Sequence, residues 1–148
     1  MPDEEVKVEL REDDGFRFSA SFPGAAWGPL TLDEPAPMGT GAGPSPTQTL
    51  AAAVGHCLSV TLLDCLKRAK IPVRSIATSV VAHRGRNAEG RLRVLRFTAA
   101  IHAEPVDSAD RPRMDRCISV FEQYCTVSAS VRQGIPMDVH VDRGAGGA

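Results

Sequence analysis

Four cysteines are the residues of this sequence best suited to chemistry: Cys57, Cys65, Cys117 and Cys125. A cysteine thiolate is a nucleophile, and its reactivity depends on its surroundings. No CxxC motif is present. Cys57 and Cys65 are eight residues apart, and so are Cys117 and Cys125. On a helix this spacing separates two side chains by about 12 Å along the axis and by roughly 80° in rotation. We therefore expect any thiol partnership to join one helix to another.

Among the cross-helix combinations, we favour Cys57 with Cys125 as the reactive pair. Cys57 lies beside His56 and follows a Gly/Pro-rich loop, whereas Cys125 directly precedes the predicted start of a short helix. The unpaired backbone N–H groups of such a helix start can stabilise a thiolate. Cys65 and Cys117 have plainer surroundings, and we expect both to be small buried hydrophobic residues.

The composition is that of an ordinary folded domain, with 148 residues, 43% of them hydrophobic and 24% charged. The net charge of −1 does not favour nucleic acid or anionic lipid as a partner. The N-terminal MPDEE lacks the features of a secretory signal, and the uncharged run 50–63 is shorter than the ~20 residues of a membrane span. We expect a cytoplasmic protein with no membrane partner, one domain over residues 1–142 and a disordered tail at 143–148.

The N-terminal half predicts a β-hairpin followed by a long helix. Alternating apolar residues flank an Asp-Asp-Gly turn at 13–15, which is typical of a hairpin. Ser45, Pro46 and Gln48 then predict a helix start with a capping box, and nothing interrupts this helix before Pro72. Because the run 50–63 is uncharged on all sides, we expect the helix to be the enclosed centre of the fold.

The C-terminal half predicts two long strands around the turn at 85–90, a second helix from Asp107 or Ser108, and a short helix that ends at Gly134. A last strand is predicted at 135–142, where apolar residues alternate again. The order of elements indicates an α+β domain. Since a monomer of this size can hardly cover the central helix, we expect a homodimer.

The segments around the two favoured cysteines resemble the OsmC/Ohr family (osmotically inducible protein C and organic hydroperoxide resistance). The first is GPSPTQTLAAAVGHCLSVTLLDCLKRAKIPV and the second is FEQYCTVSASVRQGIPMDVHV. The matching features are the Gly-Pro-x-Pro start of the helix, the small residues that lead to Cys57, and the second cysteine in a C-x-V-S setting. The resemblance covers residues 44–141 well and the N-terminal hairpin loosely.

This resemblance implies an OsmC-like fold and a two-cysteine thiol peroxidase that works as an intertwined homodimer in oxidative-stress defence. Cys57 would attack an organic hydroperoxide and become a sulfenic acid, and Cys125 would resolve it as a disulfide. An external thiol or dithiol would then reduce the disulfide. No metal or organic cofactor is implied.

The sequence departs from the family at the residues that stabilise the reactive thiolate. Family peroxidases use an arginine, which a glutamate near the start of the central helix orients. Here Thr47 and Gln48 stand at the glutamate positions, and the Cys125 motif lacks the proline that often follows this cysteine. Gln48 either orients an arginine by hydrogen bonding or only completes the capping box with Ser45.

Arg17 is our candidate for the cation beside Cys57, because no lysine or arginine occurs between Arg17 and Lys67. A solvated hairpin arginine is the competing interpretation. His56 is a second candidate, but neighbouring helix positions diverge by about 100°, so we expect it to point elsewhere. Glu122 could act as an acid, and an exposed helix carboxylate is its simpler interpretation.

Two other functions remain open from the sequence. The missing glutamate motivates an OsmC-like dimeric binding module, which would hold an apolar ligand at the subunit interface with little peroxidase activity. An acyl-transfer enzyme that uses Cys57 and His56 is disfavoured, because adjacent helix positions give poor geometry between nucleophile and base.

Overall fold

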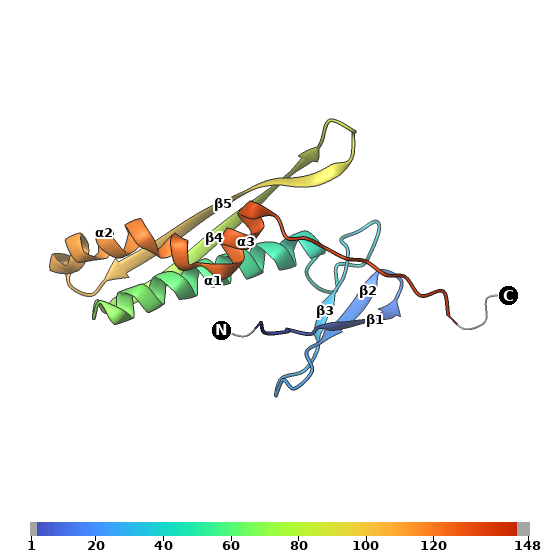
Figure 1. Cartoon of the computed structure of the whole chain (residues 1–148), viewed down its shortest axis with the longest axis horizontal. Helices are drawn as coiled ribbons and strands as arrows, with labels where there is room; N and C mark the ends of the chain where they lie inside the picture. The colour runs from blue at the N-terminus through green and yellow to red at the C-terminus, as the bar shows by residue number, and fades with distance from the viewer. Residues whose placement is uncertain (1–2, 145–148) are drawn as a thin grey trace.

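The computed structural model describes residues 3–144, which form two antiparallel sheets and a helical layer (Figure 1). This arrangement confirms the predicted α+β class. The elements in chain order are β1 (Glu9–Asp14), β2 (Arg17–Ser21), β3 (Leu30–Leu32), α1 (Pro46–Arg68), β4 (Val73–Arg86), β5 (Leu92–Pro105), the 3-10 helix η1 (Ser108–Asp110), α2 (Arg111–Val120), the 3-10 helix η2 (Phe121–Tyr124) and α3 (Thr126–Gln133).

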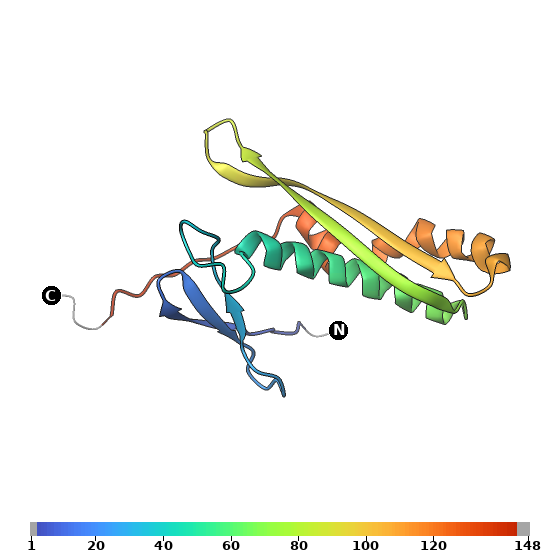
Figure 2. The same ribbon diagram turned by 180° about the vertical axis from the view of Figure 1, so that it is seen from behind.

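The predicted hairpin is formed by β1 and β2, to which β3 adds as a third antiparallel strand. The turn contains Gly15 at φ +60°, a conformation that glycine adopts without steric cost. This sheet lies beyond the N-terminal end of α1 and away from its C-terminal half, as both views show (Figures 1 and 2). In the single chain the N-terminal sheet therefore lies apart from the core that α1 forms with the other elements.

The long helix α1 begins with the predicted capping box. The Ser45 hydroxyl accepts from the Gln48 N–H at 3.2 Å, and Gln48 Oε1 accepts from the Ser45 N–H at 2.9 Å. Pro46 occupies the first turn, where a backbone N–H would have no acceptor within the helix, so its absence from proline costs no hydrogen bond. At the other end the Arg113 guanidinium donates to the Ala69 carbonyl, so α2 supplies a cation to the C-terminal end of α1.

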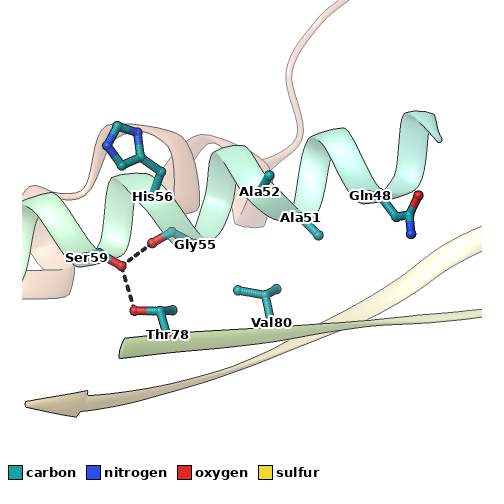
Figure 3. Close-up of a pocket in the computed structure, with 8 residues that line it drawn as sticks. All are labelled: Gln48, Ala51, Ala52, Gly55, His56, Ser59, Thr78 and Val80. Carbon is teal, nitrogen blue, oxygen red and sulfur yellow. Dashed lines mark hydrogen bonds between the residues drawn. The ribbon is translucent and has the colours of Figure 1, made fainter. Parts of the chain in front are cut away.

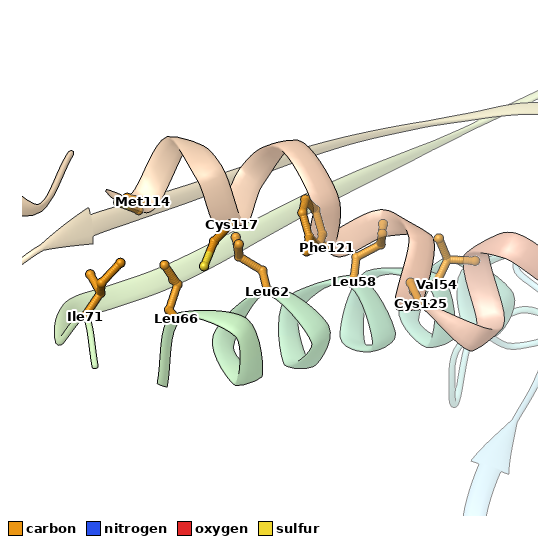
Figure 4. Packing of buried hydrophobic residues seen from close by; sticks show 9 residues of the cluster. All are labelled: Val54, Leu58, Leu62, Leu66, Ile71, Met114, Cys117, Phe121 and Cys125. Carbon is orange, nitrogen blue, oxygen red and sulfur yellow. The ribbon is translucent and has the colours of Figure 1, made fainter. Parts of the chain in front are cut away.

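The core lies where one face of α1 meets the C-terminal helical segment and the β4–β5 sheet (Figure 4). Close packing between α1 and β4 is possible because residue 55 is glycine: a Cβ there would lie 2.8 Å from Val80 Cγ2. The buried residues of this core lie on α1 and just after it, and along the segment from α2 to the start of α3: Val54, Leu58, Leu62, Leu66, Ile71, Met114, Cys117, Phe121 and Cys125.

The single chain encloses the central helix only in part. Ala52, His56 and Val60 form an exposed stripe on α1. Only 28% of an apolar 18-residue stretch of this helix is buried. By length and composition alone α1 could cross a membrane, with a mean hydropathy of 1.6, but core helices of globular proteins meet the same criterion. One chain thus leaves much of its most apolar helix uncovered.

The last strand predicted at 135–142 is also not formed. The segment extends past the N-terminal sheet without pairing to any strand of the described chain (Figure 1). Its alternating apolar residues Ile135, Met137, Val139 and Val141 are 64–84% exposed. The sequence pattern is that of a strand, but a strand needs a neighbour, and one chain provides none here. Of the predicted disordered tail, residues 145–148 lie outside the described residues.

Candidate active site

Cys57 and Cys125 lie side by side in the core, and their Sγ atoms are 3.2 Å apart. Cys57 projects from α1 and is half-buried, whereas Cys125 is only 1% exposed. A disulfide requires about 2.05 Å between the sulfurs, so the bond needs an approach of only about 1 Å. The juxtaposition expected from the sequence is present, and the catalytic roles of the two residues stay predictions.

A break between two helices positions Cys125. Its extended backbone, at φ −80° and ψ 106°, ends η2 and begins α3 at Thr126. The Cys125 N–H donates to the Glu122 carbonyl, and its own carbonyl accepts from the Ala129 N–H, each at 3.1 Å. Cys125 is therefore the N-cap residue of α3, and its sulfur sits at the positive end of that helix.

The surroundings of Cys125 favour its thiolate. Burial alone would raise the pKa of Cys125, but the hydrogen bonding that Ser128, Cys57 and Thr61 offer to its thiolate outweighs burial, so the pKa is lowered. The Cys125 side chain forms no capping hydrogen bond to α3. Neither Ser128 nor Thr61 was singled out by sequence reasoning, although the C-x-V-S motif already contains the serine.

Gln48 does not lie at the sulfur pair. Its side chain is exposed and bound to the Ser45 N–H, nine residues before Cys57 and about 13 Å along the helix. The capping-box interpretation of Gln48 is thus confirmed by geometry. An orienting role toward an arginine stays a prediction.

Arg17 lies in β2 of the N-terminal sheet, which does not pack on the Cys57 region of α1 within the described part of one chain. The single chain therefore brings Cys57 and Cys125 together but does not bring Arg17 to them. A contact from a second copy is the way in which this residue could still serve the thiol, and its role stays a prediction.

His56 points away from β4 and is exposed, as expected from its angular separation from Cys57 (Figure 3). It borders a shallow pocket of about 400 Å³ above β4. In this pocket the Ser59 hydroxyl bonds to the Gly55 carbonyl and the Thr78 hydroxyl, each at 2.6 Å. These contacts fix α1 on the sheet, and the pocket lies on a different side of the helix from the sulfur pair.

Glu122 forms an ion pair with Arg132 at 2.7 Å, and both side chains are more than half exposed. This pair borders a groove of about 510 Å³ between α3, α1 and β5. The groove is also lined by Val54 and Leu58 of α1, by Phe97, and by Ser128 and Val131 of α3. Ser128 adjoins Cys125, so this groove lies next to the sulfur pair.

Cys65 and Cys117 form a second sulfur pair, with 2.7 Å between the Sγ atoms. Cys117 is buried as expected and Cys65 is half-buried, but their pairing was missed. Burial raises the pKa of Cys117 to about 11, Cys65 adds to the rise, and Arg113 opposes it. The sequence signal for this pairing was the equal spacing of eight residues within 57/65 and within 117/125. If two helical segments run antiparallel and Cys57 meets Cys125, then Cys65 meets Cys117.

Asp33 organises the loop that leads to α1, and sequence reasoning also missed it. Asp33 is 3% exposed, and its carboxylate accepts from the Thr40 hydroxyl at 2.8 Å and from the N–H groups of Glu34, Thr40 and Ala42 at 2.8–3.1 Å. The Thr40 hydroxyl and the Ala42 N–H contribute most to lowering the pKa of Asp33 to about 2. The loop is thus built around one buried negative charge.

The family comparison agrees with the geometry. A family model described as OsmC-like protein matches residues 39–140, a span that contains all four cysteines. The chain belongs to the OsmC-like protein family, which confirms the resemblance found in the sequence. A comparison with curated proteins finds no match.

Solved structures share this fold at low sequence identity. An OsmC-like protein from Mycoplasma pneumoniae matches with a TM-score of 0.72 and 15% identity over 88% of this chain and 89% of that chain. The organic hydroperoxide resistance protein OsmC from Legionella pneumophila gives 0.62 and 15% over 88% and 92%. The organic hydroperoxide resistance protein OhrB of Bacillus subtilis gives 0.57 and 15% over 86% and 90%. These likenesses establish the OsmC-like fold.

Proposed function

We propose that this protein is a thiol-dependent peroxidase that reduces organic hydroperoxides in oxidative-stress defence. The observation that carries the proposal is the 3.2 Å separation of two sulfurs of unequal exposure. A hydroperoxide can reach half-buried Cys57, whereas Cys125, at 1% exposure, is reached only through Cys57 or by a local opening. Cys57 is therefore the peroxidatic residue and Cys125 the resolving one.

The reaction needs only the two thiols and a hydroperoxide. The Cys57 thiolate attacks the terminal peroxide oxygen, the O–O bond breaks, and the alkoxide leaves as an alcohol after taking up a proton. The product is a Cys57 sulfenic acid. The Cys125 thiolate attacks its sulfur, and hydroxide leaves as water after protonation. The lowered pKa of Cys125 supports this second step, since the thiolate is the attacking form.

An external thiol or dithiol completes the cycle. It attacks the more accessible Cys57 sulfur of the disulfide and expels Cys125, which is a good leaving group because its pKa is lowered. A second attack on the mixed disulfide releases the oxidised reductant. We place this chemistry in the cytoplasm, and the cycle requires no bound metal or organic cofactor.

We further propose that the protein works as an intertwined homodimer. Support comes from the exposed stripe of α1 and from the unpaired segment 135–142, whose alternating apolar side chains need a sheet to cover them. A second copy would supply that sheet and bury α1. The same arrangement offers a route for Arg17 of one copy to approach Cys57 of the other.

A binding module is the second candidate function. It is favoured by the position of Gln48, which is held in the helix cap, and by the distance of the Arg17 strand from Cys57 in one chain. A dimer of this kind would hold an apolar ligand at its subunit interface with little turnover. It predicts tight binding of an apolar probe by the reduced protein and hydroperoxide consumption no faster than that of free thiol.

Consumption of cumene hydroperoxide by the pre-reduced protein tests the peroxidase proposal. We expect Cys57→Ser to lower the rate at least about 100-fold, because the nucleophile is lost. Cys65→Ser is the matched control, a half-buried cysteine of the same helix, and should keep the rate within about twofold. Full activity in Cys57→Ser would exclude the proposed nucleophile, and an inactive wild-type protein would favour the binding module.

A further inference from the structure

We propose that Cys65 and Cys117 are a second redox couple, an intramolecular disulfide that joins α1 to α2 and forms by exchange with a low-molecular-weight disulfide. The observation is the second pair of sulfurs, which face each other at 2.7 Å across the helix interface. This couple is separate from the peroxidase pair. Its oxidation would change how firmly α2 is held on α1.

The geometry requires little change for the bond to form. A disulfide needs about 2.05 Å between the sulfurs, so the two atoms must approach by less than about 1 Å. Cys117 lies in the buried cluster beside Leu62 and Leu66 (Figure 4). Cys65 packs against the same cluster from α1. Both helices are anchored at this point by core packing and by the Arg113 contact to Ala69.

The two couples cannot exchange with each other directly. Cys57 and Cys65 are about 12 Å apart along α1. Cys117 and Cys125 are also eight residues apart, with η2 between them. Thiol–disulfide exchange requires the attacking sulfur to contact the disulfide. Cys65 and Cys117 therefore do not serve as resolving residues for Cys57, and an outside oxidant must act on them.

Exchange begins at Cys65, because it is half-buried and Cys117 is 5% exposed. The Cys65 thiolate attacks one sulfur of the small disulfide, forms a mixed disulfide and releases the first thiolate. Cys117 then loses its proton and attacks the Cys65 sulfur, which releases the second. In sum two protein thiols are oxidised and one small disulfide is reduced to two thiols. The raised pKa of Cys117 makes the second step slow at neutral pH.

The bond would fix the segment that carries the resolving cysteine. Cys65 and Cys117 are 52 positions apart, so their link closes a long loop of the unfolded chain and stabilises the native state. From Cys117 the chain continues through η2 directly to Cys125. Under oxidising conditions, in which a peroxidase would work, the Cys65–Cys117 disulfide thus links α2 covalently to α1.

The test uses the double variant Cys57→Ser/Cys125→Ser, which leaves only the second couple. The reduced variant is incubated with oxidised glutathione and analysed without reduction. We expect loss of both thiols without glutathione adducts, and a rise in Tm of roughly 5–10 °C. Stable glutathione adducts, two unreacted thiols or a link between chains would overturn the proposal.

Two controls make the result specific. Replacing Cys65 by alanine in the double variant should abolish the rise in Tm. If the double variant does not fold, wild-type protein treated in the same way is digested with chymotrypsin, which cuts after Leu62 and after Phe121 and so separates the two couples. A linked peptide pair with Cys65 and Cys117 supports the proposal. Because the double variant lacks both peroxidase cysteines, its outcome does not depend on the proposed activity.

Discussion

The Sγ atom of Cys57 lies 3.2 Å from that of Cys125, although the two residues are 68 positions apart in the chain. The pairing follows from the antiparallel course of α1 and the segment α2–η2–α3. Along that course Cys65 meets Cys117 in turn. The break at Cys125 then gives the first pair a feature that the second lacks, the start of a helix at the sulfur. The two pairs therefore have the same spacing in sequence but different surroundings.

Replacing Cys125 by serine should separate attack from resolution. We expect Cys125→Ser to consume about one equivalent of hydroperoxide per Cys57 and then to stop cycling, because the sulfenic acid has no thiol partner. Mass spectrometry of the intact protein should show one added oxygen first, and two or three with excess peroxide. Rapid turnover with an external dithiol and without oxygen addition would contradict a resolving role for Cys125.

Removing the Ser128 hydroxyl should make Cys125 a weaker acid. Ser128 donates to the Cys125 thiolate, so Ser128→Ala removes a bond that favours the charged form. We expect the pKa of Cys125 to rise, so that alkylation at Cys125 shifts to higher pH. The measurement is the pH dependence of thiol alkylation in a Cys57→Ser background, with the adduct at Cys125 quantified by mass spectrometry.

Ser130→Ala is the control for this prediction, since Ser130 lies on the same helix and is half-buried. It should leave the alkylation profile where it was. Equal profiles for Ser128→Ala and the unsubstituted background would show that the serine does not support the thiolate.

The two roles considered for Gln48 make different predictions. The capping box predicts that Gln48→Ala destabilises the protein by about 0.5–1 kcal/mol, because the Ser45 N–H loses its acceptor. Gln48→Glu keeps that acceptor and adds a negative charge at the helix start, so it should restore or exceed the wild-type stability. Urea unfolding measures both. A faster peroxidase rate in Gln48→Glu alone would indicate that a carboxylate here also orients a cation.

Acid should weaken the loop that Asp33 holds together. The folded pKa of Asp33, about 2, is below its ordinary value of 3.8, so its contribution to stability is complete above about pH 4 and is lost as the pH falls through 2. Asp33→Asn should lower the Tm at pH 7 by a few degrees, because an amide presents donors to the loop N–H groups. The difference between the two proteins should narrow from pH 4 to pH 2. A constant difference would contradict this account.

Local patterns in the sequence predicted most of the elements. The hairpin turn at 13–15, the capping box at Ser45 and the period of apolar residues in the helices each act over a few residues, so the sequence shows them directly. The Cys57–Cys125 pairing was predicted from the surroundings of the two cysteines and from the family resemblance. Single-chain geometry then placed both sulfurs as expected.

The remaining features depend on contacts between distant segments. The Asp33 carboxylate gains its role from N–H groups 7 and 9 residues further on, which no local pattern marks. Cys65 and Cys117 were treated as separate core residues because their pairing requires the antiparallel register of two helical segments. The strand at 135–142 was predicted from its own alternation, yet a strand forms only beside a partner, and the described chain offers none.

The exposed segment 135–142 gives the sharpest test of the homodimer. Val139 is 73% exposed in the single chain and belongs to the apolar side of the alternating segment. If a second copy covers that side, Val139→Asp buries a charge and should shift the protein toward monomer by at least about tenfold in dissociation constant. His140→Asp, on the opposite side, should have little effect. Analytical ultracentrifugation measures both, and equal behaviour of the two variants would contradict the role of this segment in assembly.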